Sequence, residues 1–267
     1  MPVDLWQPWG GESSDPGTLA SFPMLPWCNR ITGGGFTHMG QFHAMAPNRP
    51  GEPYPIHGDG WLQAWQVVEA SATQAVLGLQ SRGFMGNPYA YDAEQRFTLM
   101  AGGLEQVLSV THRGSESRPY GLGMHPWFPR TPETRFLADV DGIWLCGANA
   151  IPTVHTTRIP PDLDVRDACP AIGARIDHLY TGWSGRAAIR WPNHGLSVQI
   201  ESATMEGPDG TRGAGYCQVY RPEQGAAFCL EPVSHPVDAF HLPGQPGLIV
   251  LATDESLRMT VRWRIRT

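Results

Sequence analysis

The sequence contains no lysine, and all 19 of its basic residues are arginine. Without a lysine amine, the chain cannot form a Schiff base, anchor pyridoxal phosphate or build a Walker-type phosphate loop. It also has no G-x-S-x-G motif, which argues against a hydrolase with a serine nucleophile. Any covalent intermediate would therefore have to form on Ser, Cys, Asp or Glu.

The sequence also lacks ordered patterns of cysteine and histidine. The five cysteines are scattered, odd in number and without C-x-x-C spacing, so we expect neither a disulfide framework nor a zinc site built on thiols. The ten histidines form no cluster with the spacing of metal ligands. We therefore expect no metal site.

Charge and long apolar runs are scarce. Charged residues make up 16% of the 267 residues, the net charge is −6, and no basic run occurs, so we expect neither nucleic acid nor an acidic membrane as a partner. No apolar run approaches the ~20 residues needed to span a bilayer. Residues 1–22 show neither the basic nor the apolar region of a signal peptide. We expect a soluble, cytoplasmic protein.

What the sequence does contain is a series of short strand patterns. The 31 glycines and 25 prolines favour many turns between short strands. Residues 257–265 alternate strictly between apolar residues and mostly arginine, which predicts a strand with one buried face. Residues 187–191 and 196–200 flank a loop of about four residues and predict a hairpin.

Further strand pairs are predicted along the rest of the chain. Residues 95–100 and 104–111 flank two glycines in the manner of a hairpin, and residues 65–70 pair plausibly with residues 75–80. Residues 248–252 predict another buried strand.

One predicted hairpin depends on turn residues alone. Residues 136–140 and 143–145 flank Asp141-Gly142, the strongest short hairpin signal.

The proline-rich residues 159–170 are interpreted as a surface loop. No window keeps a helical period beyond about two turns, and no composition break or repeat marks a second domain. We therefore predict an all-β, mainly antiparallel fold in which residues 1–267 form a single domain.

Two polar motifs carry the sharpest candidates for acid–base chemistry. Glu231 follows the apolar residues 226–230 and precedes Pro232, so its carboxylate is either a paired structural ion or a positioned base. His125 has a similar place at the end of a strand within residues 123–128. A lone histidine there is as easily a core or loop residue as a catalytic acid.

Other residues are candidates for contact with a ligand. His57 lies in a turn with Gly58 and Gly60 that lets the backbone approach a ligand closely. Trp61 follows and could form a platform for a sugar ring or simply pack in the core. Asn29 could both donate to and accept from hydroxyl groups.

Three more candidates have ordinary alternatives. Arg30 could hold two hydroxyls with its guanidinium or form a surface salt bridge. Asp177 could accept hydrogen bonds from hydroxyl groups or cap a turn, and Gln218 is the weakest candidate of the set.

Over about residues 25–240, the order and wording of these motifs resemble the aldose 1-epimerase (galactose mutarotase-like) family, and most closely its shorter bacterial branch. Residues 29–31 resemble the family's sugar-binding Asn-Arg pair. Residues 56–58 resemble its first histidine motif, and residues 123–128 the second, which bears the general acid. Residues 230–232 resemble the segment with the general base.

The resemblance implies an antiparallel β-supersandwich with a sugar groove on one concave face. It also implies an isomerase that interconverts the α and β anomers of a free hexose or related sugar, without metal or organic cofactor. Glu231 would be the general base at the C1 hydroxyl, and His125, as imidazolium, would be the general acid at the ring oxygen. His57 would orient the sugar. The expected sugar-binding residues are Asn29, Arg30, His57, Asp177, Gln218 and Trp61.

Three alternatives remain open. A sugar phosphate as substrate would require several basic residues at the groove, of which the sequence assigns only Arg30. A non-catalytic sugar-binding or sensing module could use the same scaffold, although binding alone does not need both His125 and Glu231. A metal-dependent, cupin-like isomerase comes last.

Overall fold

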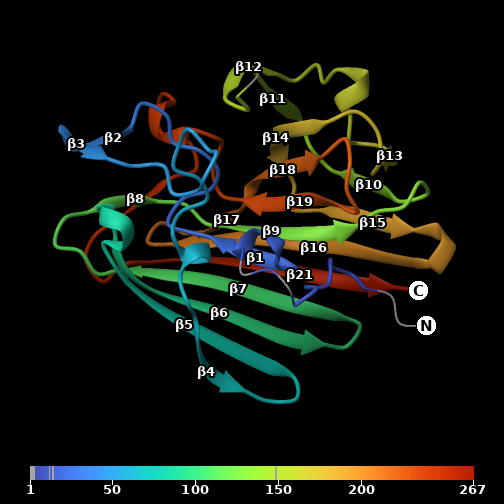
Figure 1. Ribbon diagram of the computed structural model, residues 1–267, viewed down its shortest axis with the longest axis horizontal. Helices are drawn as coiled ribbons and strands as arrows, with labels where there is room; N and C mark the ends of the chain where they lie inside the picture. Colours follow the sequence, from blue (N-terminus) through green and yellow to red (C-terminus); the bar gives the residue numbers. More distant parts are fainter. Residues whose placement is uncertain (1–3, 12, 14, 148) are drawn as a thin grey trace.

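The computed structural model describes residues 4–11, 13, 15–147 and 149–267 (Figure 1). Within these residues the chain forms 21 β-strands, six short 3-10 helices and no α-helix. No helix in the described part is long and apolar enough to cross a membrane.

The strands fall into two large sheets and two small pairs. A ten-stranded sheet has the order β13-β10-β15-β16-β21-β7-β6-β5-β4, and β17 pairs with β16 outside this path. Its strands are β4 (Gln66–Ala70), β5 (Gln74–Arg82), β6 (Ala90–Met100), β7 (Gly103–His112), β10 (Arg135–Ala138), β13 (Cys169–Pro170), β15 (Ala187–Trp191), β16 (Leu196–Gly207), β17 (Gly210–Gly213) and β21 (Ser256–Arg266).

The second large sheet has seven strands in the order β1-β9-β19-β18-β14-β11-β12. Its strands are β1 (Ser21–Met24), β9 (Gly123–Pro129), β11 (Gly142–Cys146), β12 (Pro152–Thr156), β14 (Ile176–Trp183), β18 (Gly215–Arg221) and β19 (Ala227–Val233). The remaining strands form the pairs β2 (Gly35–His38) with β3 (Gln41–Ala44) and β8 (Arg118–Tyr120) with β20 (Ile249–Leu251). The 3-10 helices are η1 (Pro16–Thr18), η2 (Gly60–Leu62), η3 (Phe84–Gly86), η4 (Pro161–Leu163), η5 (Pro192–His194) and η6 (Ala239–His241).

The predicted all-β, antiparallel fold is confirmed, and so are most of its hairpins. The pairs β4–β5, β6–β7 and β15–β16 are antiparallel, as their sequence patterns predict. Residues 248–252 contain β20, and the alternating residues 257–265 lie within β21.

The hairpin predicted around Asp141-Gly142 is wrong. β10 pairs with β13 and β15 in the ten-stranded sheet, whereas β11 pairs with β12 and β14 in the other sheet. The backbone N–H of Asp139 donates to Arg186, next to β15, but the N–H of Asp141 donates to Thr181 in β14. The turn therefore carries the chain from one sheet to the other, because the hydrogen bonds of neighbouring strands outweigh the local turn signal.

The proline-rich residues 159–170 are only partly a surface loop. They contain η4 and β13, and Val165 is fully buried. The carbonyl oxygen of Val165 accepts the N–H of Ala138 at the end of β10. Apolar side chains within this segment therefore help to cover the core.

The main core lies between the two large sheets. Phe128 of β9 and Phe228 of β19 are register partners, with ring centroids 5.9 Å apart. Phe128 also contacts Trp263 of β21, and Phe228 contacts Phe136 of β10, both in the ten-stranded sheet. Because side chains alternate along a strand, the residues next to these phenylalanines point to the opposite face of the seven-stranded sheet. That face carries the candidate site.

Candidate active site

A cavity of about 360 Å³ opens on the outer face of the seven-stranded sheet. This volume lies within the range of small-molecule sites, roughly 300–1,000 Å³. Strands β1, β9, β14, β18 and β19 supply about half of its walls, and the segment between β3 and η2 supplies four more residues. The others come from η1, from the segment between β1 and β2, and from the residue before β14. The lining residues are Gly17, Phe22, Asn29, Arg30, Arg49, Glu52, Ile56, His57, His125, Trp127, Arg175, Asp177, Gln218, Tyr220 and Glu231.

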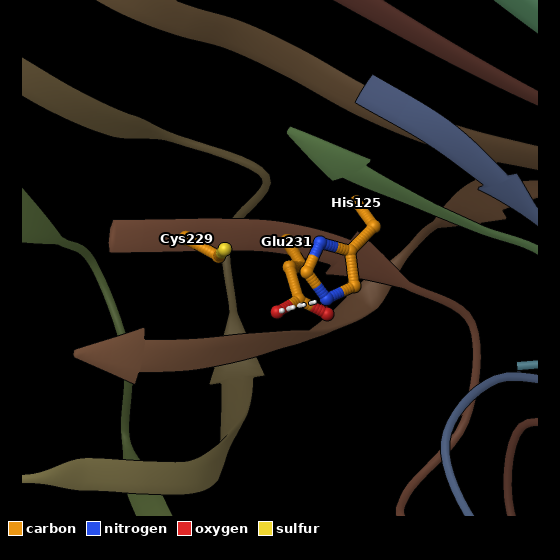
Figure 2. Close-up of side chains that lie close together, drawn as sticks. All are labelled: His125, Cys229 and Glu231. Carbon is orange, nitrogen blue, oxygen red and sulfur yellow. Dashed lines mark ion pairs between the residues drawn. The ribbon is translucent and has the colours of Figure 1, made fainter. Parts of the chain in front are cut away.

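His125 and Glu231 face each other inside this cavity (Figure 2). The ladder between β9 and β19 pairs Trp127 with Cys229 and Gly123 with Val233, which places His125 opposite Glu231. The Nε2 atom of His125 lies 3.4 Å from an Oε atom of Glu231. Both side chains are buried, and both line the cavity.

Burial favours the neutral form of both groups. It raises the pKa of the Glu231 carboxyl well above its usual range, and the negative charge of Asp177 raises it further. It lowers the pKa of the His125 imidazole to about 3. The proton shared by the pair therefore resides on the carboxyl, whereas the sequence led us to expect imidazolium and carboxylate. The motifs indicate that the groups face each other, but not how dry their surroundings are.

His57 is held as a hydrogen-bond donor toward the cavity. Its ring Nδ1 atom accepts the backbone N–H of Asn29 at 3.1 Å. The backbone N–H of His57 donates to the carbonyl oxygen of Asn29 at 2.9 Å. Burial is the main cause that lowers the pKa of His57 well below its usual value, so the ring is neutral. With Nδ1 accepting, the proton lies on Nε2.

The turn beside His57 requires glycine. Gly58 has a φ of +72°, and a Cβ there would lie 1.8 Å from the carbonyl oxygen of Leu25. His57 and Asn29 also have positive φ values, 59° and 53°. The glycine thus lets the two segments approach closely enough to exchange their hydrogen bonds.

Gln218 and Asp177 form a second polar wall. Gln218 lies opposite Glu231 in the ladder between β18 and β19. Its Nε2 donates to Asp177 at 2.9 Å, and the other carboxylate oxygen of Asp177 accepts from Arg175 at 2.8 Å. The Oε1 atom of Gln218 is buried and has no partner among the described residues. It can therefore accept a hydrogen bond from a ligand.

Arg30 is fixed by two neighbours. Its Nε and one terminal nitrogen donate to the two oxygens of Glu52, both at 3.0 Å. Another terminal nitrogen lies 3.2 Å from the Oδ1 of Asn29. Asn29, Arg30 and Glu52 thus line one side of the cavity as a hydrogen-bonded group.

Trp61 does not line the cavity. It is buried, its indole N–H donates to the carbonyl of Gly58, and its ring stacks on Phe22 at 5.2 Å. Phe22 in turn stacks on His125, with centroids 4.3 Å apart. Trp61 therefore supports the ring that supports His125, instead of presenting a face to a sugar.

Several lining residues were missed by the sequence analysis. Trp127 comes two residues after His125, and Tyr220 two residues after Gln218, so strand alternation alone could have identified both. Their rings meet edge to face at 5.9 Å, and the indole N–H of Trp127 is buried without a partner among the described residues. Arg49 lies in a loop and carries no comparable signal.

Sequence comparison places the chain among known proteins. The family model described as aldose 1-epimerase matches residues 7–264. The chain is 34% identical to the uncharacterized protein YphB of Escherichia coli K12 over 261 residues, which cover 96% of this chain and 87% of YphB.

Solved structures are similar over most of the chain. The crystal structure of an Escherichia coli K12 protein proposed to be an aldose 1-epimerase has a TM-score of 0.87 at 31% identity, covering 98% of this chain and 88% of that one. A galactose mutarotase-like protein from Clostridium acetobutylicum has a TM-score of 0.77 at 16% identity, covering 92% and 79%, and is similar in fold. The β-supersandwich implied by the sequence motifs is confirmed. The chain belongs to the aldose 1-epimerase family.

Proposed function

We propose that this protein interconverts the α and β anomers of an aldose by opening and closing the sugar ring. The observation that carries the proposal is the pair His125 and Glu231, which lie 3.4 Å apart in a cavity large enough for one pyranose. Ring opening requires a base that reaches the C1 hydroxyl and an acid that reaches the ring oxygen.

In the proposed reaction, Glu231 as carboxylate takes the proton of the C1 hydroxyl while His125 as imidazolium donates a proton to the ring oxygen. Rotation about C1–C2 in the open aldehyde exposes its other face, and reclosure reverses both transfers. Since burial favours the proton on Glu231, it must first move to His125. Sugar hydroxyls supply polar partners for the carboxylate and so favour that transfer.

The other lining residues have supporting roles in this proposal. His57 donates from Nε2, and Gln218 accepts through its free oxygen. Asn29, Arg30 and Asp177 bind hydroxyl groups from the walls. Trp127 and Tyr220 take the place that the sequence analysis gave to Trp61, because their rings border the cavity. Exchange NMR between anomer signals, across a panel of free hexoses, tests the activity. Sugar binding without faster exchange would favour the non-catalytic alternative.

An anionic sugar is a second candidate substrate, because three arginines line the cavity: Arg30, Arg49 and Arg175. The guanidinium of Arg30 is already held by Glu52. Among the described residues, the one carboxylate that Arg49 contacts is that of Asp15, at 3.5 Å. Arg49 therefore has donors available for a carboxylate or phosphate on the sugar.

This second candidate is tested by comparing a free hexose with its 6-phosphate and its uronic acid. If the anion is recognised, Arg49→Gln should lower kcat/KM for the charged sugars by roughly 10–100-fold, the scale of a charged hydrogen bond, and leave the neutral hexose unchanged. Equal effects on all three sugars would contradict it.

We also propose that the whole chain acts as one domain. A single cluster of buried residues extends from Leu25 to Trp263 and includes side chains of both large sheets. The cavity likewise combines residues from Gly17 to Glu231.

A further inference from the structure

The fold brings a third buried side chain next to the acid–base pair. Cys229 lies two residues before Glu231 in β19, so both side chains point to the same face of the sheet (Figure 2). A ring nitrogen of His125, the sulfur of Cys229 and a carboxylate oxygen of Glu231 all lie within 4.8 Å of one another. The spacing of the three residues in the sequence does not match a metal-binding motif, which is why we expected no metal site.

These three groups form a ligand set of a known kind. Nitrogen, sulfur and carboxylate oxygen are the donors that zinc prefers, at about 2.0–2.3 Å from the metal. A tetrahedral arrangement at those lengths separates neighbouring ligand atoms by about 3.3–3.8 Å. His125 and Glu231 already meet this spacing at 3.4 Å. Since the three ligand atoms lie within 4.8 Å of one another, the sulfur needs to approach by at most about 1–1.5 Å to reach this spacing. Side-chain rotation can supply such a movement.

The surroundings carry charges of both signs. Asp177 adds negative charge close to Glu231, Glu52 pairs with the guanidinium of Arg30, and the positive charge of Arg49 acts on His125. The Nδ1 of His125 is buried without a partner among the described residues. The cavity provides access from solvent to His125 and Glu231.

We propose that His125, Cys229 and Glu231 form a binding site for a thiophilic divalent cation such as Zn²⁺. The thiol and the carboxyl lose their protons to solvent when they ligate the ion. Because the Nδ1 of His125 lacks the outer partner that usually orients a metal-bound imidazole, we expect reversible binding and no resident metal. Given the proposed function, an ion there occupies both acid and base, so it inhibits the enzyme.

Cobalt provides the direct test, because a thiolate bound to Co²⁺ gives a charge-transfer absorption band. The full-length protein titrated with Co²⁺ should develop this band, and Zn²⁺ should abolish it by displacement. Cys229→Ser should lose the band, and its affinity for Zn²⁺ in calorimetry should fall at least about tenfold, since even outer-shell changes cost that much. Cys217→Ser is the matched control, because Cys217 is equally buried on the adjacent strand β18. It should behave like the unmodified protein.

No thiolate band, or equal Zn²⁺ affinity in the protein and in Cys229→Ser, would overturn the proposal. His125→Asn gives an independent test if Cys229→Ser fails to fold, because loss of the nitrogen ligand should also weaken Zn²⁺ binding at least about tenfold.

Inhibition by Zn²⁺ is measured separately, as the rate of anomer exchange with and without the ion. Cys229 does not line the cavity, so Cys229→Ser should keep the basal anomer exchange and resist Zn²⁺. If no sugar is turned over, the proposed function fails, but the cobalt titration still decides the metal site.

Discussion

The two faces of strands β9 and β19 differ in the chemistry and packing of their side chains. On the inner face, the apolar side chains of Phe128 and Phe228 pack against rings of the other sheet. On the outer face, His125 and Trp127 each keep a buried nitrogen without a partner among the described residues. Neighbouring residues of each strand thus differ in their surroundings: the inner face packs in the core, and the outer face lines the cavity with buried nitrogens that lack a partner among the described residues.

Among substitutions on the outer face, Glu231→Gln is expected to have the largest effect, which is on the rate of anomer exchange. The swap is nearly isosteric but removes the proposed base, so anomer exchange should fall by about 10²–10⁴-fold, the range of general acid–base catalysis. The free energy of unfolding should not decrease, since a buried ionisable group is lost. Exchange NMR and urea denaturation measure the two quantities. Glu206→Gln, an exposed carboxylate of β16, is the control. Full exchange activity in Glu231→Gln would exclude it as the base.

On the inner face, Phe228→Ala is expected to change the stability of the fold instead. Removing a fully buried phenylalanine should lower the free energy of unfolding by about 3–5 kcal/mol. The folded fraction should keep its KM, because Phe228 points away from the cavity. Phe42→Ala is the control, since that ring on β3 is 55% exposed and should cost less than about 0.5 kcal/mol. A large loss of activity in folded Phe228→Ala would show that the two faces are coupled.

A smaller effect is expected in the pH dependence of the free energy of unfolding, which reports on the buried histidine of the outer face. The pKa of His125 falls from an ordinary value near 6.5 to about 3 in the folded protein. The unfolded chain therefore binds this proton first, and stability decreases as pH falls from about 6.5 toward 3. Glu231 acts in the opposite sense, because its pKa is raised on folding.

His125→Asn isolates the histidine contribution. In this variant, the loss of stability between about pH 6.5 and 3 should be shallower than in the unmodified protein, as measured by urea denaturation at several pH values. His194→Asn, an exposed residue at the end of η5, should leave the slope unchanged. Identical slopes for all three proteins would mean that His125 is not desolvated.

Much of the fold could be predicted from the sequence because its signals are local. Alternation in residues 257–265 and the short loops between strands identify elements whose partners are adjacent in the chain. The turn at Asp141-Gly142 was misassigned because membership of a sheet depends on distant strands. No local pattern contains that information.

The site was predictable to a similar extent. The motifs named seven of the 15 residues that line the cavity, among them His125 and Glu231. They also assigned Trp61 to the ligand, although it lies behind Phe22. The sequence could not show that burial favours neutral forms of the central pair. Nor could it show that Cys229 lies beside His125, since that depends on the ladder between β9 and β19.

The decisive experiment on the roles of Glu231 and His125 is a crystal of Glu231→Gln soaked with the hexose that exchanges fastest. We expect a pyranose in the cavity, with its C1 hydroxyl within hydrogen-bond distance of the side chain at position 231 and its ring oxygen facing His125. A sugar bound elsewhere, or bound here with C1 directed away from both side chains, would contradict it.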